Sequence, residues 1–200
     1  MSMHDANSRL SRRSILMAAP ALALATLGAG RAHAGEQNWP PVFETGRNQF
    51  TVVRPRVTMP PLRLQDLRGK ELLLAPKPGR IALINFWATW CAACRFDLPT
   101  LASLARQQRD ALDVTAICTD TRDISKIREF LDGVNAPGLA IYVDAYGAAT
   151  AATAVFSLLG MPITYLVGAS NHVEGYITGA ADWLSPQGAR LLHFYREQTS

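Results

Sequence analysis

Two of the three cysteines are separated by only two residues. Cys91 and Cys94 follow the apolar run 81–87 and open the segment 92–108, in which apolar side chains recur at helical spacing. A C-x-x-C pair at a strand-to-helix junction can close a small disulfide ring. Its first thiol faces the free N–H groups and the positive end of the helix dipole, which favour the thiolate. The spacing therefore predicts a redox-active disulfide, with Cys91 as the nucleophile and Cys94 as the residue that resolves the mixed disulfide.

Other uses of this pair fit the sequence less well. A zinc site needs about four ligands, and the chain has neither a second cysteine pair nor a suitably spaced histidine pair. Covalent haem attachment needs a histidine directly after the second cysteine, where this chain has Arg95. A purely structural disulfide that closes so small a loop would stabilise the fold little. We therefore expect a redox site that needs no metal and no cofactor.

The third cysteine, Cys118, ends the apolar run 114–118. This run is typical of a buried strand, and an unpaired cysteine is among the residues most often found in protein cores. We expect Cys118 to be an inert core thiol. A regulatory or copper-related role is the alternative.

Periodicity and turn residues predict the elements that must position the cysteines. Alternating apolar residues predict a hairpin over 62–74. Strands are predicted at 81–87, 114–118 and 139–143, and a strand pair at 163–167 and 173–178 with a tight turn at 168–171. Helices are predicted over 92–108, 124–131 and 147–159, and after Ser185, with Pro186 in the first turn. Strands that alternate with helices indicate an α/β fold, with a central mixed sheet flanked by helices on both faces.

The residues around the cysteine pair resemble the active-site signature of the thioredoxin superfamily. Residues 85–95 have the sequence NFWATWCAACR, which is similar to the signature of the exported TlpA/ResA-type disulfide reductases. The resemblance extends to Leu98-Pro99, to 160–164 and to 179–183. It implies a thioredoxin-like fold over 57–200, with an N-terminal hairpin and an inserted helix–strand unit at about 123–143.

The resemblance also implies roles for residues that would contact a substrate. Pro162 matches the cis-proline that faces the dithiol in this family. A cis bond there exposes the backbone of Met161, which can then pair with a substrate strand. Trp90, directly before the first cysteine, is implied to contact substrate as well. An ordinary trans proline that opens a strand is the alternative for Pro162.

One acidic residue follows the pair at helical spacing. Asp97 stands three residues after Cys94, where these reductases usually have a glutamate, and it could shuttle the proton of that thiol. The alternative is an acid that merely favours a helix N-terminus, because the aspartate side chain is one methylene shorter. Asn85 stands where cytoplasmic thioredoxins carry a buried aspartate, which favours the TlpA/ResA-type group.

The N-terminal residues resemble a twin-arginine export signal. Arg12 and Arg13 directly precede an apolar stretch over 15–30, and Ala32-His33-Ala34 is a pattern that signal peptidase accepts. We expect residues 1–34 to be removed after Ala34. A Sec signal and an uncleaved membrane anchor are the alternatives. Residues 35–56 contain proline clusters and little periodicity, and we expect them to form an irregular leader.

The composition fits a single small enzyme domain. The chain has 200 residues, of which 48% are hydrophobic, so it can bury a core without cross-links. Loss of residues 1–34 would remove four arginines and one aspartate, so the net charge of +4 would fall to +1. Without residues 1–34, the chain has no lysine- and arginine-rich run interleaved with aromatic residues, and we expect no nucleic-acid partner.

Together, these features predict an exported thiol–disulfide oxidoreductase that reduces client-protein disulfides as a monomer in the periplasm. The resemblance implies a membrane-bound thiol electron donor, and clients such as apocytochrome c or copper-site assembly proteins. One alternative is a Cu(I)-binding assembly factor for a respiratory oxidase, because two thiolates suit Cu(I). A peroxidase on the same fold is the other alternative.

Overall fold

The computed structural model describes residues 39–147, 149, 151 and 155–198. The expected export signal over 1–34, its cleavage site after Ala34 and the first residues of the expected leader lie outside this part of the chain. The signal and its removal therefore stay predictions. Among the described residues, no helix is both long and apolar enough to cross a membrane.

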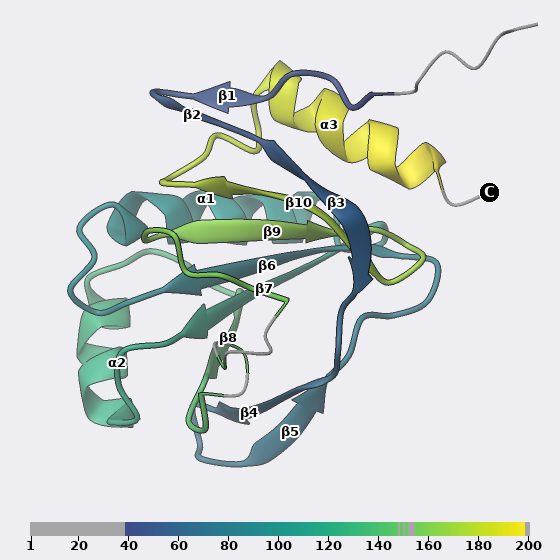
Figure 1. Cartoon of the computed structure of the whole chain (residues 1–200). Helices are drawn as coiled ribbons and strands as arrows, with labels where there is room; N and C mark the ends of the chain where they lie inside the picture. Colours follow the sequence, from purple (N-terminus) through teal and green to yellow (C-terminus); the bar gives the residue numbers. More distant parts are fainter. Residues whose placement is uncertain (1–38, 148, 150, 152–154, 199–200) are drawn as a thin grey trace, which may run out of the picture. The chain divides into compact units, whose positions relative to one another are not determined.

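In the described residues, strands and helices alternate over 81–143, whereas the strands over 44–74 and over 163–178 follow one another without a helix (Figure 1). The strands are β1 (Glu44–Thr45), β2 (Asn48–Gln49), β3 (Thr51–Thr58), β4 (Leu62–Asp66), β5 (Glu71–Leu74), β6 (Ile81–Trp87), β7 (Leu112–Cys118), β8 (Ala140–Val143), β9 (Ile163–Val167) and β10 (His172–Thr178). The helices are α1 (Cys94–Gln107), α2 (Ile124–Asp132) and α3 (Pro186–Glu197). The predicted N-terminal hairpin is β4–β5, and the predicted inserted unit is α2 with β8.

Eight strands form one mixed sheet, in the order β3-β10-β9-β6-β7-β8-β4-β5. Its centre is parallel, because β6 pairs with β7 and β7 pairs with β8 in the same direction. The remaining neighbours are antiparallel. The register places Trp87 at the end of β6 beside Cys118 at the end of β7. The mixed sheet that the sequence predicts is therefore confirmed.

Strand β6 divides the core into two parts. All of its residues are buried. Leu83 and Trp87 belong to one apolar cluster, whereas Ile84 and Phe86 belong to another. Because successive residues of a strand point to opposite faces, the two clusters lie on opposite faces of the sheet. A strand covered on both faces needs a nearly continuous apolar sequence, which is why this run was recognisable.

All three helices pack on the face that carries Leu83 and Trp87. Each helix contributes buried side chains to that cluster, among them Leu98 and Leu101 of α1, Ile127 and Phe130 of α2, and Leu191 and Leu192 of α3. The ring of Phe130 stacks on Trp87, with centroids 4.9 Å apart. Arg95 of α1 also lies over the Phe130 ring, with its guanidinium carbon 4.4 Å from the ring centre. The inserted helix α2 is thereby fixed next to the start of α1.

The opposite face has no helix in the part of the chain that the structure describes. Segment 147–159, expected to be helical because it is rich in alanine, is irregular at 147, 149, 151 and 155–159. Phe156 packs against Phe86, and the Tyr165 hydroxyl binds both the N–H and the carbonyl of Ser157. These tertiary contacts use backbone groups that a helix would need, and they override the local propensity. The helix prediction is wrong at these positions, so only one face carries the described helices.

The strand β3 replaces part of the expected irregular leader. Of its residues, only Val52 and Val53 are partly buried, and Pro55 interrupts it after a cis peptide bond. β3 is an edge strand that pairs with β10 alone. Edge strands tolerate proline and need little apolar alternation, so the sequence carried no strand signal. The expected boundary between leader and domain after residue 56 falls inside this strand.

The turns and the last helix start follow the sequence prediction. Asn171 adopts a left-handed conformation with φ of 63°, and its N–H donates to the carbonyl of Gly168 to close the turn between β9 and β10. The Ser185 hydroxyl accepts from the N–H of Gly188 at 3.1 Å and caps α3, whose first residue is Pro186.

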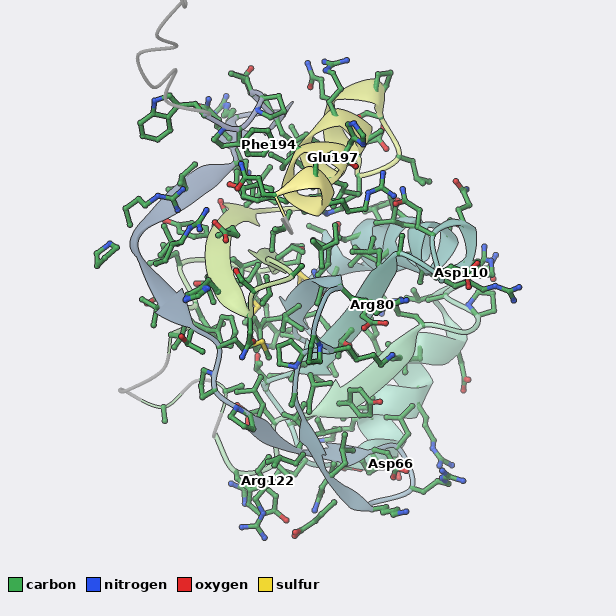
Figure 2. All side chains as sticks on the ribbon, turned by 90° about the vertical axis from the view of Figure 1, so that its right-hand side faces the viewer. Asp66, Arg80, Asp110, Arg122, Phe194 and Glu197 are labelled. Carbon is green, nitrogen blue, oxygen red and sulfur yellow. A yellow bond between two sulfur atoms is a disulfide. The ribbon has the colours of Figure 1, made fainter. Side chains whose placement is uncertain are left out.

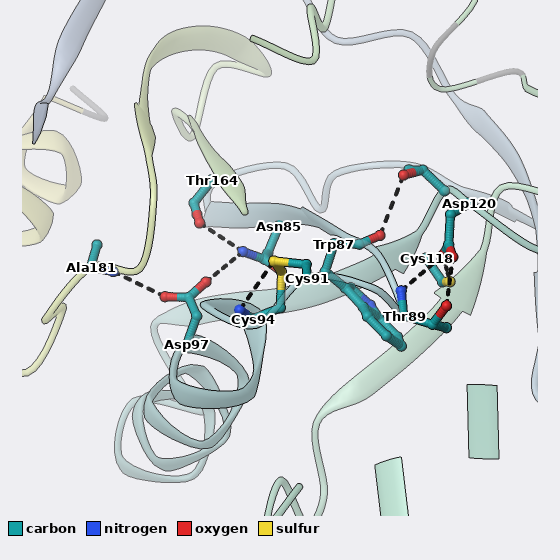
Figure 3. The surroundings of a disulfide bond; sticks show 11 residues. Asn85, Trp87, Thr89, Cys91, Cys94, Asp97, Cys118, Asp120, Thr164 and Ala181 are labelled. Atoms are coloured by element: carbon teal, nitrogen blue, oxygen red, sulfur yellow. Dashed lines mark hydrogen bonds between the residues drawn. A yellow bond between two sulfur atoms is a disulfide. The ribbon is translucent and has the colours of Figure 1, made fainter. Parts of the chain in front are cut away.

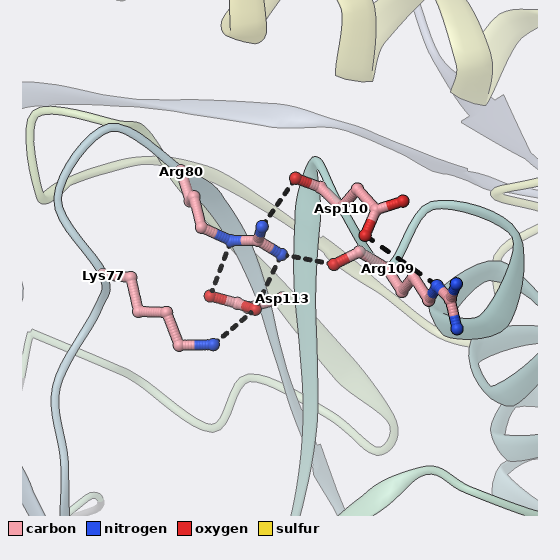
Figure 4. Close-up of polar contacts among 5 residues, drawn as sticks. All are labelled: Lys77, Arg80, Arg109, Asp110 and Asp113. Carbon is pink, nitrogen blue, oxygen red and sulfur yellow. Dashed lines mark hydrogen bonds and ion pairs between the residues drawn. The ribbon is translucent and has the colours of Figure 1, made fainter.

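Charged groups hold the end of the sheet at which β6 begins (Figure 4). Arg80 donates to both carboxylate oxygens of Asp113 at 3.0 and 3.2 Å, and to the carbonyls of Arg109 and Asp110 at 2.7 and 2.6 Å. Lys77 donates to the same carboxylate at 3.1 Å. Arg80 and Asp110 face the viewer at this end in Figure 2. The contacts join the loop before β6 to the connection between α1 and β7, so both central strands start from one fixed point.

Candidate redox site

The two cysteines lie where the central strand meets the first helix, as the sequence predicts (Figure 3). Cys91 and Cys94 form a disulfide. Cys94 is the first residue of α1, and its N–H donates to Cys91 Sγ at 3.1 Å. Cys91 is 4% exposed, whereas Cys94 is fully buried. A partner can therefore reach only the first residue of the pair, whose sulfur lies at the positive end of the helix and accepts one of its free N–H groups.

The residues expected to contact substrate lie at the same end of the sheet. Trp90 is 70% exposed. The Met161–Pro162 peptide bond is cis. Pro162 directly precedes β9, whose first residue, Ile163, pairs with Phe86 one residue before the end of β6. This register brings Pro162 to the edge from which the cysteines project, and its contact with a substrate stays a prediction.

Three further apolar side chains near this edge are exposed, and sequence reasoning did not single them out. Phe96 is 75%, Leu159 64% and Leu184 40% exposed. Phe96 fits the apolar spacing of 92–108 but is exposed, because spacing alone does not reveal which apolar residues of a helix face solvent. Exposed apolar side chains beside a reactive pair can contact a partner protein.

Asp97 lies beneath the disulfide with both carboxylate oxygens in use. Its side chain accepts from the Ala181 N–H at 3.0 Å and from Asn85 Nδ2 at 2.8 Å. The same Asn85 nitrogen donates to Thr164 Oγ1 at 2.9 Å. Within the part of the chain that is described, neither sulfur forms a hydrogen bond with Asp97 in this disulfide form. The structure thus brings Asp97 and Asn85 together, and the proton transfer by Asp97 stays a prediction.

Burial changes the acidity of Asp97. The residue is only 1% exposed, and desolvation raises its pKa from 3.8 to about 7, against the opposing effect of the hydrogen bonds from Ala181 and Asn85. Those two donors are neutral and therefore do not supply the positive charge that would keep a buried carboxylate ionised. A carboxyl group with a pKa near 7 can both accept and release a proton at neutral pH.

Asp120 is a residue of this region that sequence reasoning missed. Its carboxylate accepts from the N–H of Thr89 at 3.0 Å, from the Thr89 hydroxyl at 2.6 Å and from Cys118 Sγ at 3.1 Å. The only signal in the sequence was an acid two residues after a buried strand, at the edge where the cysteines lie. The cysteine itself is buried as expected, and burial together with the hydrogen bond to Asp120 raises the pKa of its thiol to about 12.

No group of three or more histidine, cysteine, aspartate or glutamate residues among the described residues could hold a metal ion. The two sulfurs that would serve as soft ligands are joined to each other in this structure.

The family of the chain follows from its middle section. Residues 55–175 match the family model described as the AhpC/TSA family, which is more than half of the chain. The chain belongs to the AhpC/TSA family. Among curated members of similar sequence, the thioredoxin-like protein YneN of Bacillus subtilis is 28% identical over 122 residues, which cover 60% of this chain and 69% of YneN. The thiol-disulfide oxidoreductase ResA of Geobacillus thermodenitrificans is 28% identical over 132 residues, 64% of this chain and 72% of ResA.

A third relative is similar to a smaller part of this chain. The thiol:disulfide interchange protein CycY of Rhizobium leguminosarum is 35% identical over 95 residues, which are 48% of each chain. The similarity to ResA and CycY confirms the resemblance to ResA-type reductases.

Solved structures support the fold. A secreted thiol-disulfide isomerase from Corynebacterium glutamicum has a TM-score of 0.57 at 16% identity, covering 76% of this chain and 93% of that one. A secreted Mycobacterium tuberculosis disulfide oxidoreductase homologous to E. coli DsbE has a TM-score of 0.52 at 23% identity, covering 64% and 94%. The thioredoxin-like fold is therefore confirmed, and this AhpC/TSA family member is a thiol–disulfide oxidoreductase with a C-x-x-C disulfide.

Proposed function

We propose that this oxidoreductase works as an exported reductant of client-protein disulfides. The observation that carries this proposal is the asymmetry of the pair: Cys91 is slightly exposed at a helix N-terminus, and Cys94 is fully buried behind it. Disulfide exchange requires an accessible thiolate that attacks the client and a protected thiol that then resolves the mixed disulfide.

The exchange takes place in two steps. The Cys91 thiolate attacks one sulfur of the client disulfide, which forms a mixed disulfide and releases the first client thiolate. The Cys94 thiolate then attacks Cys91 Sγ, which restores the Cys91–Cys94 disulfide and releases the second client thiolate. Two electrons pass from the enzyme to the client, and the dithiol must then be reduced again by a thiol donor, which we propose to be membrane-bound.

Asp97 accepts the proton of the Cys94 thiol in the second step. Cys94 must become a thiolate in a site without water access, so a buried base nearby is needed. Asp97 suits this role because its pKa is raised to about 7 by burial, so that it exchanges protons at neutral pH. Trp90, Met161 and cis-Pro162 form the docking surface for the client backbone, and the exposed Phe96 and Leu159 extend it.

The proposal also covers the location and the clients. We propose that residues 1–34 direct export, with cleavage after Ala34, and that the clients include apocytochrome c or copper-site assembly proteins. Solved structures whose proteins are described as secreted support the export, and the similarity to CycY and ResA supports exchange with disulfides of other proteins.

Replacement of Cys94 by serine tests the proposal. The Cys94→Ser variant keeps the nucleophile but cannot resolve, so we expect client proteins to accumulate as disulfide-linked adducts on Cys91. The adducts are purified under non-reducing conditions and identified by mass spectrometry. A Cys91→Ser variant is the matched control and should trap nothing. If Cys94→Ser traps no partner in cells that carry their native clients, and the wild-type dithiol rests fully oxidised there, the reductant role is excluded.

A further inference from the structure

Asp120 connects three groups from two segments of the chain (Figure 3). It follows β7, one residue after Thr119, and its carboxylate oxygens accept from the main-chain N–H and the hydroxyl of Thr89. Oδ1 also accepts from Cys118 Sγ at 3.1 Å. One carboxylate thus holds the segment before the redox pair to the end of the neighbouring strand.

The segment held by Asp120 is the one that presents the nucleophile. Thr89 stands two residues before Cys91, between β6 and α1. The Cys91 N–H donates to the carbonyl of Ala88 at 3.1 Å, which closes a tight turn around Thr89 and Trp90. On the other side, the Thr119 N–H donates to the carbonyl of Trp87 at 3.1 Å. The Trp90 side chain is 70% exposed, and the two hydrogen bonds from Thr89 to Asp120 anchor this turn.

All three groups that contact the Asp120 carboxylate donate a hydrogen bond to it. Thr89 Oγ1 is at 2.6 Å from Oδ2, a distance typical of a charge-assisted bond. Burial alone would raise the pKa of Asp120, but the hydrogen bonds from Thr89 and Cys118 outweigh it and hold the pKa below its ordinary value. The carboxylate therefore stays ionised at neutral pH, and Cys118 serves as one of its donors.

We propose that Asp120 is a positioning residue of the redox site, which fixes the Thr89–Cys91 turn at the start of α1, and that Cys118 acts as the hydrogen-bond donor that orients this carboxylate. Cys118 thus has a function as an intact thiol and takes no part in exchange. The proposal rests on Cys91 being the nucleophile. Without the anchor, Cys91 Sγ no longer stays at the helix N-terminus, and the thiolate loses part of its stabilisation.

The pH dependence of Cys91 alkylation in the reduced protein tests this role. Iodoacetamide is the probe, and mass spectrometry of peptides separates modification of Cys91 from that of Cys118. We expect Asp120→Ala to raise the pH midpoint of Cys91 alkylation by about one unit, and so to slow the reaction at pH 7 about tenfold. Asp120→Asn keeps an acceptor oxygen for the Thr89 N–H and should recover most of the wild-type profile.

The third cysteine gives a second, independent pair of variants. Cys118→Ser retains a donor at the same place and should leave the Cys91 profile unchanged, whereas Cys118→Ala should shift it in the same direction as Asp120→Ala by a smaller amount. Thr89→Val, which removes only the hydroxyl donor, replaces Asp120→Ala if the latter fails to fold. Thr100→Val is the matched control, because the Thr100 hydroxyl donates to the Phe96 carbonyl within α1.

Two outcomes would overturn the proposal. A folded Asp120→Ala or Thr89→Val variant with the wild-type Cys91 profile would show that the anchor does not position the nucleophile. Equal profiles for Cys118→Ser and Cys118→Ala would remove the role of the third thiol. Failure of the proposed function is distinguishable, since the wild-type protein itself would then alkylate at Cys91 with an ordinary thiol profile and Cys94→Ser would trap no client.

Discussion

A buried carboxylate at one end of the sheet has different surroundings from a buried carboxylate at the other end. At the end where β6 begins, the Glu174 side chain is 3% exposed and is bound by Arg56 Nε at 3.2 Å and by an Arg54 nitrogen at 3.6 Å. At the redox end, Asp97 is equally buried but accepts only from the neutral groups of Ala181 and Asn85. Glu174 has two guanidinium partners, whereas Asp97 has no charged partner among the residues that the structure describes.

This difference distinguishes a carboxylate that stabilises the fold from a carboxylate that can exchange a proton at neutral pH. A buried charge that faces a cation is compensated and contributes to holding elements together, and Glu174 joins β10 to the edge strand β3 in this way. A buried carboxylate without a cation is destabilised in its ionised form, so its proton is exchanged near neutral pH. The redox end gives up stability for a titratable group, which is a common feature of catalytic sites.

Removal of the Asp97 charge gives the largest expected effect. We expect Asp97→Asn to slow the resolving step about 100-fold, because the Cys94 proton then has no buried acceptor. The wild-type rate should rise with pH around 7, and the variant should lose this rise. Stopped-flow measurement of the reaction with a model disulfide between pH 6 and 8 checks both expectations. Asp182→Asn is the control, since Asp182 is an exposed acid close to Ala181.

The same variant should change how stability depends on pH. Burial raises the folded-state pKa of Asp97 from 3.8 to about 7, so between these values the folded protein keeps a proton that the unfolded chain has released. Stability from this group is therefore full below pH 4, falls as the pH rises and is lost above pH 7, by about 4 kcal/mol in total. Urea titrations should show this fall in the wild type and not in Asp97→Asn. Parallel curves for the two proteins would mean that Asp97 is ionised in the folded state at all these pH values.

Removal of the two arginines at the end where β6 begins should lower the stability and leave the rate of disulfide exchange unchanged. The double variant Arg54→Ala/Arg56→Ala leaves Glu174 buried without a counter-charge, and we expect the free energy of unfolding to fall by about 3 kcal/mol. The rate of disulfide exchange by the folded fraction should stay within twofold of wild type. Urea unfolding at pH 7 measures the first quantity and turnover of a model disulfide the second. A loss of activity without a loss of stability would contradict the structural role.

The Arg80 contacts predict a smaller effect at the same end. Arg80→Ala removes a partly buried guanidinium that binds Asp113 and two carbonyls, and we expect a loss of about 2 kcal/mol. Lys77→Ala is the matched variant, because Lys77 binds the same carboxylate from an exposed position, with 68% of its side chain exposed. Its loss should stay below about 1 kcal/mol. Thermal or urea unfolding measures which variant loses more stability. Equal losses for the two variants would contradict the importance of burial.

The sequence predicted the elements with strong local patterns and missed those that depend on neighbours. Strand β6 and the C-x-x-C junction were recognisable because a strand covered on both faces is apolar at nearly every position. Strand β3 was missed because an exposed edge strand with Pro55 needs no apolar pattern, and the helix over 147–159 was predicted from alanine content that the packing of Phe156 overrides. The exposure of Phe96 could not be predicted either, because spacing does not reveal which side of α1 is covered.

For the site, the sequence by itself determined the chemistry. Two cysteines in C-x-x-C spacing at a strand-to-helix junction define a redox pair, and the order along the helix decides which thiol is accessible, because both follow from local geometry. Only the tertiary structure decided which groups form hydrogen bonds with the carboxylates of the site. Asp97 meets Ala181, and Asp120 meets Thr89, across 84 and 31 residues of chain. Burial and long-range contacts set the pKa of a carboxylate, and the neighbouring residues in the sequence predict neither of them.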